Sequence, residues 1–109
     1  MTKFTPSAAA FVRKERDYLS GNSRSAARRF AEDISSVVRL LDEYPLAGSQ
    51  FELFKTTSFE GIRRWVKGNY RFDYEIDRNG EAVILLVRHH AQDDPFAVYE
   101  PDDNEDFDP

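Results

Sequence analysis

The spacing of apolar residues changes once along this chain, close to Gly48, and that change limits the folds it can form. Before Gly48, apolar residues recur at steps of three and four, which places them on one face of a helix. After it, apolar and polar residues alternate, as in a strand with one buried face. Segregated helices and strands predict an α+β domain in which helices cover one face of a small antiparallel sheet.

The first half of the chain predicts two helices joined by a short polar turn. Thr5 can cap the free amides of a helix, and Pro6 is tolerated at its first position. This helix should end at residues 20–23, which are Ser-Gly-Asn-Ser, and a second should run from about Ser25 to Glu43. The second helix has one apolar face, formed by Ala27, Phe30, Ile34, Val37, Val38 and Leu41. Because the connecting turn is short, we expect an antiparallel helical hairpin that ends at Tyr44-Pro45.

The second half predicts three antiparallel strands. A short strand at 62–66 precedes a half-buried strand in which every second residue is apolar: Tyr70, Phe72, Tyr74 and Ile76. Asn79-Gly80 then favours a two-residue type I′ hairpin turn, and the continuously apolar run 82–87 indicates a strand buried on both faces. Residues 3–5 could add an edge strand, and residues 50–59 fit either a loop or a strand.

Charge is distributed unevenly along the chain. Residues 93–109 hold eight acidic residues and no basic one, whereas residues 1–92 hold 12 acidic and 15 basic residues. We therefore expect a mildly basic domain over residues 1–95 and an acidic, disordered tail over residues 96–109, because the tail has too little apolar surface to offset the entropy of ordering. Such a tail either solubilises the protein, covers a basic surface or mimics the charge of a nucleic acid.

Several classes of site are not expected in this sequence. The chain has no cysteine, which excludes disulfides and thiolate metal sites, and no carboxylate spacing completes another kind of metal site. It has no Gly-rich phosphate loop, so we expect neither a metal nor a cofactor. Charge comes too early for a secretory signal, and no apolar run approaches the roughly 18 residues of a membrane span. We therefore expect a cytoplasmic protein without a membrane partner.

Basic and aromatic side chains gather on the predicted strands and suggest a phosphate-binding patch. Guanidinium groups bind phosphate oxygens through paired donors, an indole can stack on a base, and imidazole can act as a general acid or base. The candidates are Arg63, Arg64, Trp65, Lys67, Tyr70, Arg71, Arg88, His89 and His90. Successive strand residues point to opposite faces, so neither Arg63 and Arg64 nor His89 and His90 can both line one site. Arg71 could instead pair with the acidic residues on its own face.

Four segments occur in an order that resembles the RelE/ParE superfamily of bacterial toxins. They are Pro45-Leu46-Ala47-Gly48, Gly61-Ile62-Arg63-Arg64, Tyr70-Arg71-Phe72-Asp73-Tyr74, and residues 83–87 followed by Arg88-His89-His90-Ala91-Gln92-Asp93. The resemblance covers residues 3 to about 95. It implies a helical hairpin packed on a small antiparallel sheet, and the toxin half of a type II toxin–antitoxin pair.

The resemblance allows two cellular targets. RelE-like members cleave messenger RNA on the ribosome, whereas ParE-like members poison DNA gyrase. Where the nucleases commonly carry a catalytic tyrosine, this chain has Ala91-Gln92-Asp93, and it has only four lysines, so gyrase is the favoured target and enzyme activity is not expected. A nuclease would use Arg71, Arg88 and His90 for catalysis, and a target-binding toxin would use the segment Arg63, Arg64, Trp65 and Lys67. A third possibility is a non-toxic interaction module on the same fold.

The expected partner is a cognate antitoxin protein. Antitoxins bury grooves of such small toxins with an amphipathic helix and an extended segment. Anchor sites could come from Phe51, Leu53, Phe54 and Phe59, which could equally complete the domain's own core.

Overall fold

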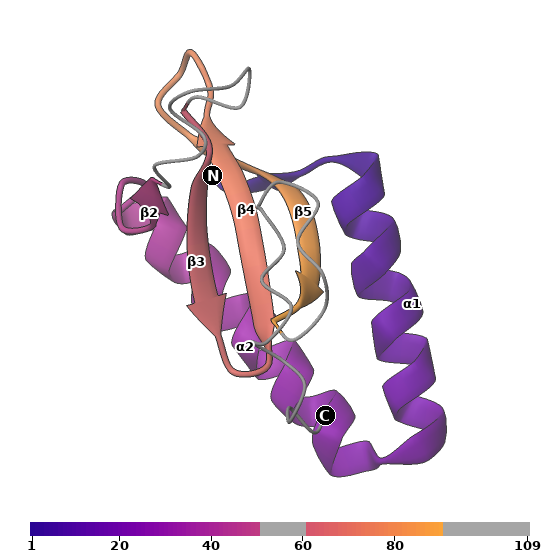
Figure 1. The fold of residues 1–109 in the computed structure, drawn as a ribbon. Coiled ribbons are helices and arrows are strands. Elements are labelled where there is room, and N and C mark those ends of the chain that lie inside the picture. The colour runs from indigo at the N-terminus through magenta and orange to yellow at the C-terminus, as the bar shows by residue number, and fades with distance from the viewer. Residues whose placement is uncertain (51–60, 91–109) are drawn as a thin grey trace, which may run out of the picture.

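The structure is a computed structural model that describes residues 1–50 and 61–90, and it contains two helices packed on one face of a sheet (Figure 1). The elements are β1 (Lys3–Phe4), α1 (Pro6–Asn22), α2 (Arg24–Glu43), β2 (Ser49–Gln50), β3 (Arg63–Lys67), β4 (Tyr70–Ile76) and β5 (Ala82–His89). In Figure 1, α2 crosses behind the sheet and α1 runs beside β5. The predicted α+β architecture, with its helical hairpin, is confirmed.

The sheet is larger than the sequence predicts. Within the described residues it has five strands in the order β1-β5-β4-β3-β2. The predicted antiparallel meander is confirmed in β3, β4 and β5, and β1 is the edge strand that residues 3–5 could add. β1 pairs with β5 in parallel, and β2 adds a fifth strand beside β3. The two additional strands contain two residues each, too few to show an alternating pattern in the sequence.

The helix ends follow from local hydrogen bonding. The Thr5 hydroxyl accepts a hydrogen bond from the backbone N–H of Ala8 at 3.2 Å, and Pro6 is the first helical residue, as predicted. Ser23 ends α1 and begins α2: its backbone N–H donates to the Leu19 carbonyl at 2.7 Å, and its hydroxyl accepts from Ala26 N–H at 3.2 Å. One serine therefore caps both helices, which keeps the connection short.

The core lies between the helices and one face of the sheet. It contains Ala8 of α1, Phe30, Val37 and Leu41 of α2, Tyr70, Phe72 and Tyr74 of β4, and Ala82, Ile84 and Val87 of β5. The prediction that β5 is buried on both faces is wrong, because Val83, Leu85 and Leu86 remain partly exposed. A β-bulge at Leu85 explains why Ile84 and Val87, three residues apart, enter the same core.

The turn between β4 and β5 is not the predicted two-residue type I′ turn. Five residues, 77–81, separate the strands, and only Gly80 among them has a positive φ, of 81°. The Asp77 carboxylate accepts hydrogen bonds from the backbone N–H groups of Asn79 and Glu81, at 2.9 and 3.0 Å. An aspartate that binds its own turn in this way favours a wider loop than Asn-Gly alone would form.

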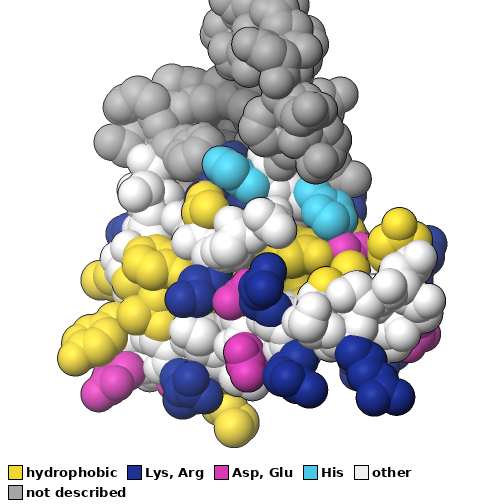
Figure 2. All heavy atoms as spheres, turned by 90° about the horizontal axis from the view of Figure 1, so that it is seen from below, with side chains coloured by type: hydrophobic (Ala, Val, Ile, Leu, Met, Phe, Trp, Pro, Cys, Tyr) yellow, Lys and Arg dark blue, Asp and Glu magenta, His cyan; other side chains and the backbone are white. Residues whose placement is uncertain are grey.

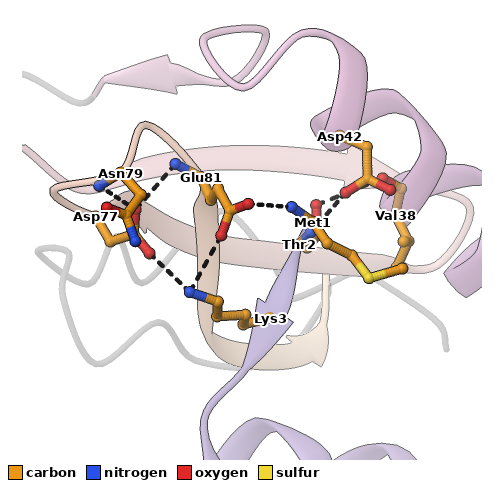
Figure 3. Close-up of polar contacts among 8 residues, drawn as sticks. All are labelled: Met1, Thr2, Lys3, Val38, Asp42, Asp77, Asn79 and Glu81. Carbon is orange, nitrogen blue, oxygen red and sulfur yellow. Dashed lines mark hydrogen bonds and ion pairs between the residues drawn. The ribbon is translucent and has the colours of Figure 1, made fainter.

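The N-terminal strand is fixed to the β4–β5 turn and to the end of α2 (Figure 3). The Lys3 ammonium lies 3.1 Å from both Asp77 and Glu81, and the backbone N–H of Thr2 donates to Asp42 at 2.5 Å. The hydrogen bond to Asp77 raises the pKa of Lys3 most, and the backbone N–H of Glu81 contributes most to the lowered pKa of Asp77. These contacts hold β1 beside β5 before the chain enters α1.

Some predictions concern segments outside the described residues. These are the strand or loop at 51–59 with its four apolar anchor candidates, the boundary near residue 95 and the acidic tail. Within residues 1–50 and 61–90, no helix is both long and apolar enough to cross a membrane, and no three potential metal ligands come together.

Candidate functional site

The face of the sheet opposite the helices carries a buried ion pair. Arg64 on β3 and Asp73 on β4 are cross-strand neighbours, and the Arg64 guanidinium donates twice to the carboxylate: Nε to Oδ1 at 2.5 Å and Nη2 to Oδ2 at 2.9 Å. Their side chains are only 8% and 2% exposed. The prediction of a half-buried β4 is therefore wrong, because paired charges allow Asp73 to be buried along with the apolar face.

Arg71 lies on the same face of β4 as Asp73, two residues before it. Its guanidinium donates through Nη1 to the carbonyls of His89 and His90, both at 3.0 Å. The residue is only 3% exposed. Its guanidinium thus binds the backbone where β5 ends, which ties that end of the strand to β4.

The three residues predicted for a nuclease come together in the structure. Arg88 is the direct cross-strand neighbour of Arg71, and the backbone of His90 contacts the same guanidinium. Arg88 is partly exposed and His90 is exposed, whereas Arg71 is buried. Only Arg88 and His90 therefore present their side chains to solvent.

The four predicted target-binding residues divide between the two faces of β3. Arg63, Trp65 and Lys67 lie on the helix side, across from Tyr74, Phe72 and Tyr70 respectively, and only Arg64 points to the opposite face. Trp65 packs against the core, and the Arg63 guanidinium donates to the Gly48 carbonyl at 2.8 Å. The structure therefore does not bring the four side chains into one patch.

Arg63 belongs to a group that fixes the loop after α2. The Tyr74 hydroxyl donates to the Pro45 carbonyl at 2.6 Å and accepts from the Gly48 N–H at 2.8 Å. A Cβ on Gly48 would lie 2.7 Å from the Tyr74 ring and 2.9 Å from the Arg64 carbonyl. Glycine is needed there because the loop backbone lies directly against the ring. Burial raises the pKa of Tyr74, against the opposing effect of the Gly48 N–H.

A polar cluster that the sequence did not predict joins α1 to the ends of β4 and β5. Glu15 accepts a hydrogen bond at Oε2 from the Tyr70 hydroxyl at 2.6 Å, and His89 Nε2 lies 3.0 Å from the same oxygen. The rings of Tyr70 and His89 pack 4.8 Å apart. Burial, followed by the hydrogen bond to Glu15, raises the pKa of Tyr70. Glu15 lies four residues from both Phe11 and Leu19, on the apolar face of α1. An acidic residue at that position of the sequence signals a buried polar contact.

Beside this cluster is a hollow of about 290 Å³ between the helices and the β3–β4 turn. It is lined by Leu19, Ala26, Arg29, Phe30, Asp33, Gly68, Asn69 and Tyr70. Gly68 has a φ of 61°, and a Cβ there would lie 2.5 Å from an Asp33 carboxylate oxygen. A glycine with positive φ at the first of two loop residues fits a type II′ turn, and it brings the turn close to α2.

Basic residues outnumber acidic ones at one end of the molecule. Around the hollow, over residues 13–33, the β3–β4 turn and the end of β5, the basic residues are Arg13, Lys14, Arg16, Arg24, Arg28, Arg29, Lys67 and Arg88, against Glu15, Asp17, Glu32 and Asp33. We call this region the basic end. Figure 2 looks at it and shows Lys and Arg side chains spread across its surface, with both histidines near its upper rim. The opposite end is nearly balanced, with Asp42, Glu43, Asp77 and Glu81 beside Lys3, Arg39 and Arg78.

A helical hairpin packed on a small sheet is the architecture that the resemblance to the RelE/ParE superfamily implied. The sequence matches the family described as ParE toxin of type II toxin–antitoxin system, parDE, over residues 2–94, and the chain therefore belongs to that family. Its fold is similar to a solved structure described as "Chromosomal ParDE TA system from P. aeruginosa", with a TM-score of 0.59 and 20% identity over 81% of this chain and 92% of that chain. No curated protein matches the sequence significantly.

Proposed function

We propose that this toxin arrests growth by poisoning DNA gyrase in the cytoplasm, and that a cognate antitoxin neutralises it. The observation that carries the proposal is the match to the ParE toxin family over residues 2–94. The resemblance drawn from the sequence implies DNA gyrase as the target of ParE-like members. A type II toxin of this family implies a protein antitoxin as partner.

The burial of Arg64 and Arg71 counts against a nuclease that would use either side chain. A nuclease needs cationic side chains that reach the phosphate and stabilise its developing charge. Arg64 is buried against Asp73, and Arg71 is buried against two backbone carbonyls, so either one would have to leave its contacts to reach RNA. Moving a buried charge out of such contacts costs free energy that an open site would not require.

Within the predicted target-binding segment, the geometry suggests different tasks for different residues. Lys67 is partly exposed beside the β3–β4 turn and carries a charge that a partner can contact, whereas Arg63, Arg64 and Trp65 make internal contacts that hold β3 in place. We propose Lys67 as the direct contact to the target and the other three as residues that shape the surface around it.

A gyrase assay tests this function. Purified toxin at micromolar concentration should inhibit supercoiling and accumulate cleaved DNA, and the antitoxin should abolish both effects. Lys67→Glu should weaken inhibition about ten-fold or more, as expected for a contacted charge. Arg78→Glu, the same charge change at the exposed β4–β5 turn, should leave it unchanged. Normal supercoiling at high toxin concentration would refute the proposal.

The same preparation of toxin distinguishes gyrase poisoning from the nuclease alternative. If the toxin cut messenger RNA on translating ribosomes, primer extension would show new ends, and Arg88→Ala with His90→Ala would remove them. Cutting with no effect on gyrase would replace the proposed function. If neither activity were detected and expression without the antitoxin were harmless, a non-toxic interaction module would be favoured.

A further inference from the structure

The hollow beside the β3–β4 turn has the size and lining of a site for one aromatic side chain. Its apolar lining comes from Leu19, Ala26, Phe30 and Tyr70, and its polar residues lie around these. A volume of about 290 Å³ is at the lower limit of ligand cavities, which suits a single ring better than a large ligand. Phe30 and Tyr70 are only 2% and 6% exposed and pack together, with ring centroids 4.7 Å apart. The partly exposed Leu19 and Ala26 therefore supply most of the apolar surface that a ring could contact.

The surroundings of the hollow favour a negatively charged occupant. Arg29 lines it, and the exposed Arg24 and Arg28 lie on the same first turns of α2, with Lys67 at the adjoining turn. The acidic residue in its lining, Asp33, lies against the backbone of Gly68. An acidic segment with an aromatic residue therefore fits both the charge and the shape of the site.

The chain itself carries such a segment, and it starts at this site. The backbone N–H of His90, the last described residue, donates to the Asn69 carbonyl at 2.7 Å, and Asn69 lines the hollow. The sequence that follows contains Phe96, Tyr99 and Phe107 among eight acidic residues and no basic one. Residues 91–96 can span up to about 20 Å, which is enough to return from His90 to the hollow.

We propose that the acidic tail, residues 96–109, together with Asp93 and Asp94 before it, docks on the basic end of its own chain and places an aromatic side chain in the hollow. The tether keeps the tail at a millimolar effective concentration, so weak ion pairs and one buried ring suffice to keep the site occupied. A docked tail covers the hollow and neutralises the arginines of α2. A partner that uses the basic end must displace it first. The inference does not depend on which target the toxin has.

Paramagnetic relaxation in the full-length chain tests the docking. The chain has no cysteine, so Asp106→Cys gives a single position for a nitroxide label. The label should broaden the backbone amide signals of Gly68, Asn69 and the first turns of α2. A free tail would also pass near these residues, because a coil of 16 residues has a root-mean-square length of roughly 20–24 Å. The diagnostic result is therefore the response to charge, which a free tail would lack.

Charge reversal on α2 separates docking from mere proximity. Arg28→Glu with Arg29→Glu should reduce the paramagnetic rates at Gly68 and Asn69 by about two-fold or more, and 0.5 M salt should do the same. Arg39→Glu, an exposed arginine nearer the other end of α2, is the matched control and should leave the rates unchanged. Replacing Phe96, Tyr99 and Phe107 by serine should also lower them.

Two results would overturn the proposal. Rates that do not respond to salt or to the α2 substitutions would mean that the tail only diffuses near the basic end. A second experiment mixes isotope-labelled chain without a nitroxide with unlabelled chain that carries the nitroxide. If the isotope-labelled signals broaden in this mixture, the occupant is the tail of a second copy. Each variant must also be folded, which unchanged chemical shifts of the backbone amides at the opposite end of the molecule would show.

Discussion

The buried pair Arg64–Asp73 leads to a strong prediction about stability. Arg64→Met would leave the Asp73 carboxylate, 2% exposed, without the two N–H donors that contact it at 2.5 and 2.9 Å. Removing one partner of such a pair costs about 3–5 kcal/mol, because the remaining charge stays buried. A domain of this length has a total unfolding free energy of about 5–15 kcal/mol, so the single variant should be close to unfolding.

A double-mutant cycle measured by urea unfolding checks this reasoning. Asp73→Val alone should cost a similar amount, since it leaves the buried guanidinium without its carboxylate. The double variant Arg64→Met/Asp73→Val should be more stable than either single variant, because two apolar side chains can share the space of the pair. If the double variant lost about the sum of the two single losses, the ion pair would not be what couples β3 to β4.

An exposed ion pair provides the control for this cycle. The Lys3 ammonium contacts Asp77 at 3.1 Å, with side-chain exposures of 52% and 24%. Water screens this pair, so Lys3→Met should change the unfolding free energy far less than Arg64→Met. Equal losses at the two sites would mean that burial does not determine the effect.

Three further predictions concern the turns and the pH dependence of stability. Gly48→Ala should destabilise the fold, because the new methyl group would meet atoms at 2.7–2.9 Å, whereas Gly21→Ala, with nothing within 4 Å, should not; thermal melts compare them. The folded pKa of Asp77 is lowered, first by the backbone N–H of Glu81, so its contribution to stability is present above its unfolded pKa of about 4 and is lost as pH falls through the folded value. Melting points from pH 6 to pH 3 should therefore fall less for Asp77→Asn than for the parent. Burial raises the folded pKa of Tyr70, so its contribution is present below about pH 10 and lost as pH rises above it, and alkaline melts of Tyr70→Phe should lose less stability over that range.

The sequence predicted the helical half of the fold closely because helix signals are local. Thr5, Pro6 and Ser23 act on backbone groups within a few residues, and the apolar spacing of the second helix marks the face that meets the core. It predicted the sheet less well. Pairing of β1 with β5 joins residues 80 positions apart, and a two-residue strand carries no pattern that would reveal its partner.

The candidate site shows the same division. The alternation of side chains along β3 and at the end of β5 already implied that Arg63 and Arg64 face apart, and so do His89 and His90. It did not reveal what those side chains contact. Arg71 was a candidate phosphate ligand, and in the structure its Nη1 donates to the carbonyls of His89 and His90 at the end of β5.

Periodicity, capping and composition are enough to predict the helices, the main strands, their order, the core face of α2, and a basic body followed by an acidic tail. Those features depend on interactions between near neighbours. The folded structure is needed to show which charges are buried together, as in Arg64 with Asp73 and Glu15 with Tyr70 and His89. A buried charge is tolerated only beside its partner, and that partner is set by strand register and helix placement, which no short stretch of sequence encodes.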